Sequence, residues 1–83
     1  MWYLYIVECK DQSFYVGITH NLKQRLREHN TGKGCKYTKY RYPVKLVYLE
    51  KYANISLAMK REKQIKGWNR EKKMELIESK SHL

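Results

Sequence analysis

Residues 3–29, YLYIVECKDQSFYVGITHNLKQRLREH, decide the fold of this chain. Residues 2–9 are mostly aromatic and β-branched, a composition that favours a β-strand. After a polar turn, residues 14–19 have the same character, so we predict that the two strands form a β-hairpin. Because side chains alternate along a strand, its two faces should carry Trp2, Leu4 and Ile6 on one side and Tyr3, Tyr5 and Val7 on the other.

Gly17 interrupts the second predicted strand. A glycine inside a strand costs stability and usually marks a bulge or a close approach to the backbone. We therefore expect a phosphate or a neighbouring tyrosine to lie close to the sheet at this position.

Three helices are predicted from asparagine or serine caps and glycine stops. The first begins at Asn21 and runs to about residue 30, the second begins at Asn54 or Ser56 and runs to about residue 66, and the third follows Asn69 over residues 70–79. Gly32 and Gly67 should end the first two. Met74 and Ile77 are the expected anchors of the last helix, and residues 80–83 should fray.

Two polar residues occupy core-facing positions of the first predicted helix. Helical spacing places Arg25 and His29 on the same arc as Leu22 and Leu26. Both polar side chains should therefore point toward the body of the protein or a cleft beside it.

A glutamate occupies the apolar stripe of the second predicted helix. That stripe consists of Ile55, Ala58, Met59 and Ile65, and Glu62 belongs to it by spacing. Because an unpaired carboxylate is costly in such a place, Glu62 should meet a cation or a metal ion.

Residues 31–43 form a loop rich in glycine, lysine and tyrosine. Basic side chains can pair with phosphates while tyrosines stack on bases or sugars, so the candidate nucleic-acid-binding residues are Lys33, Lys36, Tyr37, Lys39 and Arg41. The alternative is a solvated loop whose tyrosines cover the edge of the core. A third strand is predicted over residues 44–49, with its inward and outward residues less cleanly divided.

Charge dominates the composition. Eighteen lysines and arginines against eight acids give a net charge of +10 on 83 residues, which implies an anionic partner, most simply nucleic acid. No apolar run approaches the ~20 residues needed to cross a bilayer. Cys9 and Cys35 have no metal-like spacing and are expected to be reduced structural thiols, so we expect a cytoplasmic monomer without a membrane partner; no protein partner can be inferred.

In order and spacing, five features together resemble the GIY-YIG nuclease superfamily, in particular its short stand-alone members. They are Tyr3-Leu4-Tyr5, Tyr15-Val16-Gly17, Arg25, His29 and Glu62. The first motif lacks the glycine that names the family but keeps its last tyrosine. The resemblance implies a single α/β domain over residues 1–83, with a motif-bearing core over 2–68 and a C-terminal helix over 69–79. Its expected architecture is a three-stranded, mostly antiparallel sheet flanked by helices in the order β-β-α-β-α-α.

The resemblance also implies catalytic roles for Tyr5, Tyr15, Arg25, His29 and Glu62. By motif position, Arg25 would contact the scissile phosphate and Glu62 would bind a divalent metal ion, with Mg²⁺ expected. The general base would be a tyrosine or His29. These assignments fit the residue types, because a guanidinium matches phosphate oxygens and a carboxylate suits a hard cation. Imidazole titrates near neutral pH.

Each residue also has a plain structural interpretation. Tyr5 and Tyr15 are common strand aromatics, Arg25 and His29 could line a helix edge, and Glu62 could pair with a buried arginine such as Arg25. The expected function is a metal-dependent endonuclease acting on DNA. The alternatives are a catalytically silent nucleic-acid-binding module and a ribosome-associated or protein-bound accessory factor.

Overall fold

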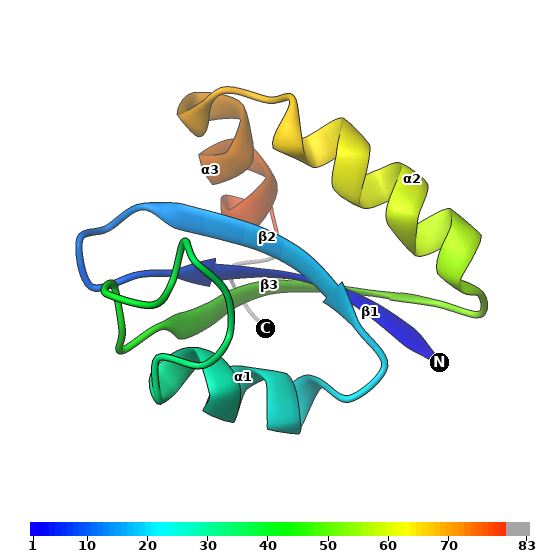
Figure 1. Cartoon of the computed structure of the whole chain (residues 1–83). Coiled ribbons are helices and arrows are strands. Elements are labelled where there is room, and N and C mark those ends of the chain that lie inside the picture. Colours follow the sequence, from blue (N-terminus) through cyan, green and yellow to red (C-terminus); the bar gives the residue numbers. More distant parts are fainter. Residues whose placement is uncertain (80–83) are drawn as a thin grey trace.

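The computed structural model describes residues 1–79 and contains one three-stranded sheet and three helices (Figure 1). The strands are β1 (Trp2–Glu8), β2 (Phe14–Thr19) and β3 (Lys45–Tyr52), and the helices are α1 (Leu22–Asn30), α2 (Ile55–Lys66) and α3 (Arg70–Glu78). The element order β-β-α-β-α-α confirms the predicted architecture. The tail expected to fray, residues 80–83, lies outside the described residues.

The sheet is antiparallel, with β1 at its centre and the strand order β2-β1-β3. Pairing of β1 with β3 shifts between Ile6 and Val7, whose partners are Tyr48 and Leu46. This bulge leaves Val47 without a partner in the register, and it changes which side chains of β3 point inward. The bulge explains why inward-facing and outward-facing residues do not alternate regularly along the third strand. The strand also continues to Tyr52, beyond the predicted end at residue 49.

Helices cover both faces of the sheet, α1 on one side and α2 with α3 on the other (Figure 1). The α2–α3 side buries Leu4 and Ile6 of β1, and the α1 side buries Tyr5 and Val7. The alternation predicted for the first strand is therefore confirmed. Among residues 1–79, no helix combines the length and the apolar character needed to cross a membrane.

The predicted asparagine caps are confirmed at all three helices. Their side-chain oxygens accept hydrogen bonds from backbone amides three residues on: Asn21 from Gln24, Asn54 from Leu57 and Asn69 from Lys72. Gly32 adopts a φ of 78°, the left-handed conformation that ends a helix at low cost to glycine.

The apolar stripe predicted for α2 is partly wrong. Ala58 and Ile65 are fully buried, but Ile55 and Met59 are 40% and 52% exposed. Successive residues turn by about 100° around a helix, so Ile55 and Met59 lie about 60° and 100° from Ala58, on the same side as Glu62. The helix faces the sheet with its Ala58–Ile65 edge, while Ile55 and Met59 turn toward solvent and the Glu62 side chain, 23% exposed, lies at the border.

Arg61 holds α2 in this rotation. It lies on the opposite side of the Ala58–Ile65 edge from Glu62, and its Nε and Nη2 each lie 3.0 Å from a Glu50 carboxylate oxygen on β3. Tyr48 and Tyr52 donate their hydroxyls to the same carboxylate. A fork of this kind fixes orientation as well as position, so it sets the direction in which Glu62 points.

The anchors of α3 differ from the prediction at one position. Leu76 and Ile77 pack against the core, whereas Met74 is 38% exposed. The helix ends at Glu78, with Ser79 as its C-terminal cap.

Candidate active site

Tyr5 crosses the sheet directly over Gly17, its partner in the hairpin register. A Cβ atom at position 17 would lie 2.5 Å from the Tyr5 hydroxyl and 2.7 Å from the ring carbon that carries it. Only glycine leaves room for the phenol in this position. The prediction that a tyrosine lies close to the sheet at Gly17 is confirmed.

His29 is fully buried beneath this hairpin and is hydrogen-bonded through both ring nitrogens. Its Nε2 lies 2.9 Å from the Tyr5 hydroxyl, and its Nδ1 lies 2.7 Å from Thr38 Oγ1. One tautomer lets Tyr5 donate to Nε2 while Nδ1–H donates to Thr38, and the other reverses both bonds. Both the His29 ring and the Tyr5 side chain are covered, and the polar contacts of the ring run to Tyr5 and Thr38.

The contacts of His29 with the 31–43 loop could not be found from the sequence. Thr38 is fully buried against the ring, and a Cβ at Gly34 would lie 2.2 Å from its Nδ1. The Thr38 hydroxyl also lies 3.5 Å from the Cys35 sulfur. A glycine and a threonine in a polar loop form no recognisable sequence pattern. Their contacts with His29 arise only because the loop folds over α1. Both cysteines are free thiols, as expected.

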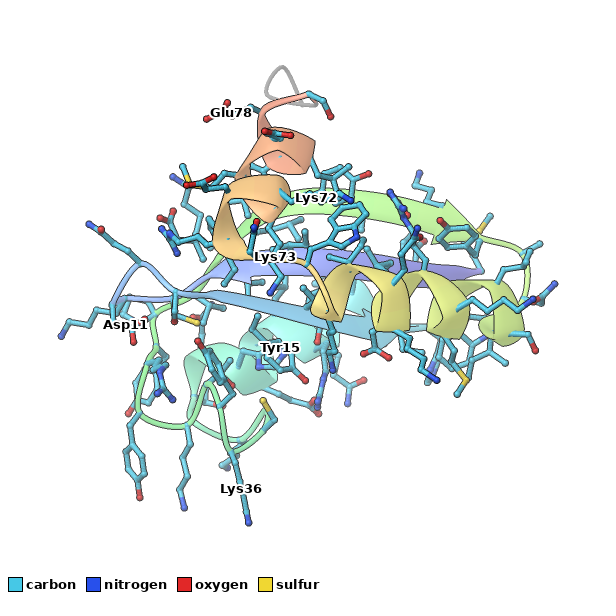
Figure 2. All side chains as sticks on the ribbon, turned by 90° about the horizontal axis from the view of Figure 1, so that it is seen from above. Asp11, Tyr15, Lys36, Lys72, Lys73 and Glu78 are labelled. Atoms are coloured by element: carbon cyan, nitrogen blue, oxygen red, sulfur yellow. The ribbon has the colours of Figure 1, made fainter. Side chains whose placement is uncertain are left out.

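Tyr15 joins the loop to the site. Its ring stacks on Tyr37 at a centroid distance of 5.8 Å and lies 5.3 Å from the His29 ring. Figure 2 shows Tyr15 at the edge of the sheet, with α2 beside it, and Lys36 pointing away at the end of the loop. Tyr37 is therefore part of the site as well as of the loop.

Two of the predicted nucleic-acid-binding residues have internal partners. The Arg41 guanidinium lies 4.3 Å from the centre of the Tyr37 ring and donates to Asp11 at 3.1 Å and to the Tyr37 carbonyl at 2.7 Å. Arg41 thus ties the loop to the β1–β2 turn and supports the Tyr37 stack. Lys33, Lys36 and Lys39 are exposed, as a phosphate-binding surface requires.

Arg25 is partly buried beside Tyr5 on α1. Its Nη1 lies 3.0 Å from Glu28 Oε1, one turn along the helix. The structure therefore does not support the alternative that Glu62 pairs with Arg25. The charge of Arg25 acts on both Tyr5 and His29.

Glu62 meets a cation, as its position predicted, and the cation is Lys66. The two side chains are 3.3 Å apart, and the Lys66 ammonium lies 5.5 Å from the centre of the Tyr15 ring. Within residues 1–79, three or more histidine, cysteine, aspartate or glutamate side chains nowhere gather to hold a metal ion. A single carboxylate nevertheless fits Mg²⁺, which retains water ligands and often takes one or two carboxylates together with substrate phosphates.

Burial sets the protonation of the hydrogen-bonded groups. It raises the pKa of the Tyr5 phenol and of the Tyr15 phenol. It also lowers the pKa of His29, and the charge of Arg25 lowers it further. At neutral pH the site therefore holds two protonated phenols and a neutral imidazole.

Tyr5→Phe should destabilise the protein, because it leaves His29 Nε2 buried without a partner. An unsatisfied buried polar atom costs about 1–3 kcal/mol, which in a domain of this size lowers Tm by several degrees. Thermal unfolding followed by circular dichroism measures the effect. Tyr40→Phe is the matched control, since Tyr40 is 83% exposed and should leave Tm unchanged. Equal melting temperatures for Tyr5→Phe and the parent protein would contradict this account of the bond.

Residues 1–75 match the family model of the GIY-YIG catalytic domain. The UPF0213 protein SH2523 of Staphylococcus haemolyticus is 53% identical over 76 residues, which cover 92% of this chain and 93% of that protein. The UPF0213 protein HQ_3675A of Haloquadratum walsbyi is 51% identical over 76 residues, which cover 92% of this chain and 85% of that protein. The solution NMR structure of the UPF0213 protein BH0048 from Bacillus halodurans is similar to this fold, with a TM-score of 0.65 and 40% identity, covering 98% of this chain and 87% of that one.

Proposed function

The chain belongs to the GIY-YIG family, and on this premise we propose that it is an endonuclease that hydrolyses DNA phosphodiester bonds with the help of a divalent metal ion. The observation that carries the proposal is the hydrogen-bonded Tyr5–His29 pair, with Tyr15 and Arg25 beside it. Phosphodiester hydrolysis needs an activated water, stabilisation of charge on the phosphate and a place for the water's proton.

Tyr5 and His29 can move that proton as a pair. As the water attacks phosphorus, its proton would pass to the Tyr5 oxygen while the phenol proton passes to His29 Nε2, leaving an imidazolium. Thr38 then accepts from His29 Nδ1–H and keeps the ring in the required tautomer. In the free protein Arg25 opposes this protonation. A phosphate bound at Arg25 would offset its charge and raise the basicity of His29 when substrate is present.

Arg25 and Glu62 would act on the phosphate itself. The Arg25 guanidinium offers a planar set of donors to non-bridging oxygens. Glu62 would hold Mg²⁺, releasing Lys66, and the bound ion would supply neutralisation of charge on the phosphate and the leaving oxygen. Lys66 already lies over Tyr15, so the released ammonium remains at the site.

The test is incubation of the pure protein with single-stranded, duplex, flapped and branched DNA, with Mg²⁺ or with EDTA. We expect cleavage in Mg²⁺ and none in EDTA. DNA binding without cleavage under all conditions would favour the alternative of a catalytically silent nucleic-acid-binding module.

DNA binding should weaken steeply with salt, because exposed basic side chains, the lysines of the 31–43 loop among them, supply the phosphate contacts. About four to six such contacts give a slope of log K against log salt of about −3.6 to −5.4. Fluorescence anisotropy between low and physiological salt measures it. Lys36→Ala should reduce the slope by about one unit. Lys73→Ala is the charge-matched control, because Lys73 lies on α3, across the sheet from α1 (Figures 1 and 2). This variant should leave the slope unchanged. An affinity that does not change with salt would contradict the electrostatic account.

A further inference from the structure

A pocket of about 310 Å³ lies beside Arg25, away from the tyrosines of the site. It opens where the start of β1, the end of β2 and the first turns of α1 meet. Its lining includes Trp2, His20, Asn21, Gln24, Arg25 and Glu28. A volume of this size is within the range of small-molecule sites in proteins. None of the catalytic steps proposed above involves this pocket.

The walls of the pocket suit a flat, neutral ligand. Trp2 and His20 form an aromatic corner, with ring centroids 5.2 Å apart and planes inclined by 62°. A planar ring can stack on either of them, and such stacking is worth about 1–3 kcal/mol per base in nucleic-acid complexes.

The polar groups of the pocket match the edge of a nucleobase. The Asn21 and Gln24 amides contact each other at 3.2 Å, and the Gln24 amide nitrogen lies 3.4 Å from Glu28. The Gln24–Glu28 bond is long and both bonds lie at the exposed surface, so a ligand can replace them at little cost. The Gln24 amide offers donors and an acceptor, the combination that reads base edges, and Asn21 adds its amide nitrogen as a donor while its oxygen caps α1.

Electrostatics disfavour a phosphate inside the pocket itself. The Glu28 carboxylate lines the wall and already pairs with Arg25 at 3.0 Å. An anion in the pocket would face this carboxylate, whereas a neutral base would not. The Arg25 guanidinium lies between the pocket and Tyr5. A phosphate bound by Arg25 can therefore place the nucleoside attached to it in the pocket.

We propose that this pocket binds one unpaired nucleobase next to the phosphate held by Arg25. A base that is still paired in a duplex cannot enter a pocket lined on several sides. The preferred substrate is therefore a strand with an unpaired nucleotide at the cut site, as in single strands, flaps and frayed ends. The position of the base relative to the cut rests on the proposed function, but the existence of the pocket ligand does not.

Tryptophan fluorescence tests the proposal directly. In a Trp68→Phe background, Trp2 is the only tryptophan, and stacking of a base should quench it. The probes are deoxyadenosine and deoxycytidine 5′-monophosphates, compared with 2-deoxyribose 5-phosphate, which lacks the base. We expect saturable quenching with at least tenfold tighter binding of the nucleotides, which corresponds to about 1.4 kcal/mol. Equal affinity for the sugar phosphate, or no saturation by nucleotides, would overturn the proposal.

Gln24→Ala provides a second measurement in a variant that keeps the aromatic corner. Its binding to a single-stranded oligonucleotide in EDTA should weaken about fivefold, while duplex binding stays unchanged. The matched control is Gln64→Ala, because Gln64 is an exposed glutamine on α2. This variant should bind single-stranded and duplex DNA with the affinity of the parent protein. Equal weakening toward both DNA forms would overturn the pocket proposal even if cleavage is observed. Selective weakening supports it even if the protein never cuts DNA.

Discussion

Glu62→Gln should abolish Mg²⁺-dependent cleavage. The substitution keeps the size of the side chain and removes the charge that would hold the ion. Because a bound metal supplies several kcal/mol of charge stabilisation, we expect kcat to fall by at least about 10³-fold. A cleavage time course in Mg²⁺ measures the loss. Glu71→Gln in the first turn of α3 is the matched control, since its side chain is exposed and lies outside the site.

The same variant should keep its stability. Among residues 1–79, the ion-pair partner of Glu62 is Lys66, one turn away and half exposed, and helix pairs of this kind contribute about 0.3–0.5 kcal/mol. A melting curve in EDTA should therefore shift by no more than about 4 °C. Had Glu62 paired with Arg25, the variant would leave a guanidinium without its partner and melt several degrees lower. A stable Glu62→Gln variant that cuts at the parent rate would end the case for Glu62 as the metal ligand.

Arg25→Ala should lower the cleavage rate much more than the affinity for DNA. Arg25 is one of 18 lysines and arginines that attract the polyanion, but its charge also acts directly on both Tyr5 and His29. Losing a donor to the transition state costs about 3 kcal/mol, or roughly 150-fold in rate. Single-turnover cleavage and anisotropy binding, measured on the same substrate, separate the two effects.

Arg27→Ala is the control for this comparison. Arg27 is exposed two residues along the same helix, so the variant loses the same charge without touching the site. It should weaken binding slightly and leave the rate of bound substrate unchanged. Equal losses of rate and affinity in Arg25→Ala would make Arg25 a simple phosphate clamp.

Local patterns in the sequence were sufficient for the order of elements and for much of the site. Alternating residues defined the hairpin, and asparagines marked each helix start, because both signals act over only a few residues. Spacing also placed Arg25 and His29 on the inner arc of α1, where the structure puts them. The placement of these two residues could therefore be predicted, and their catalytic roles stay a prediction.

The rotation of α2 and the covering of His29 were decided only by the tertiary structure. Ile55 looked like a core residue by spacing, but the Arg61–Glu50 fork turns the helix so that Ala58 and Ile65 meet the sheet instead. Gly34 and Thr38 close over His29 because the 31–43 loop is pulled back by Arg41 onto the hairpin turn. Each of these contacts joins two different elements or loops of the chain, and hydrophobic periodicity within one element carries no information about such pairs. Residue types and local spacing are enough to name the candidate chemical groups, whereas contacts between separate elements set which of these groups are buried, paired or exposed.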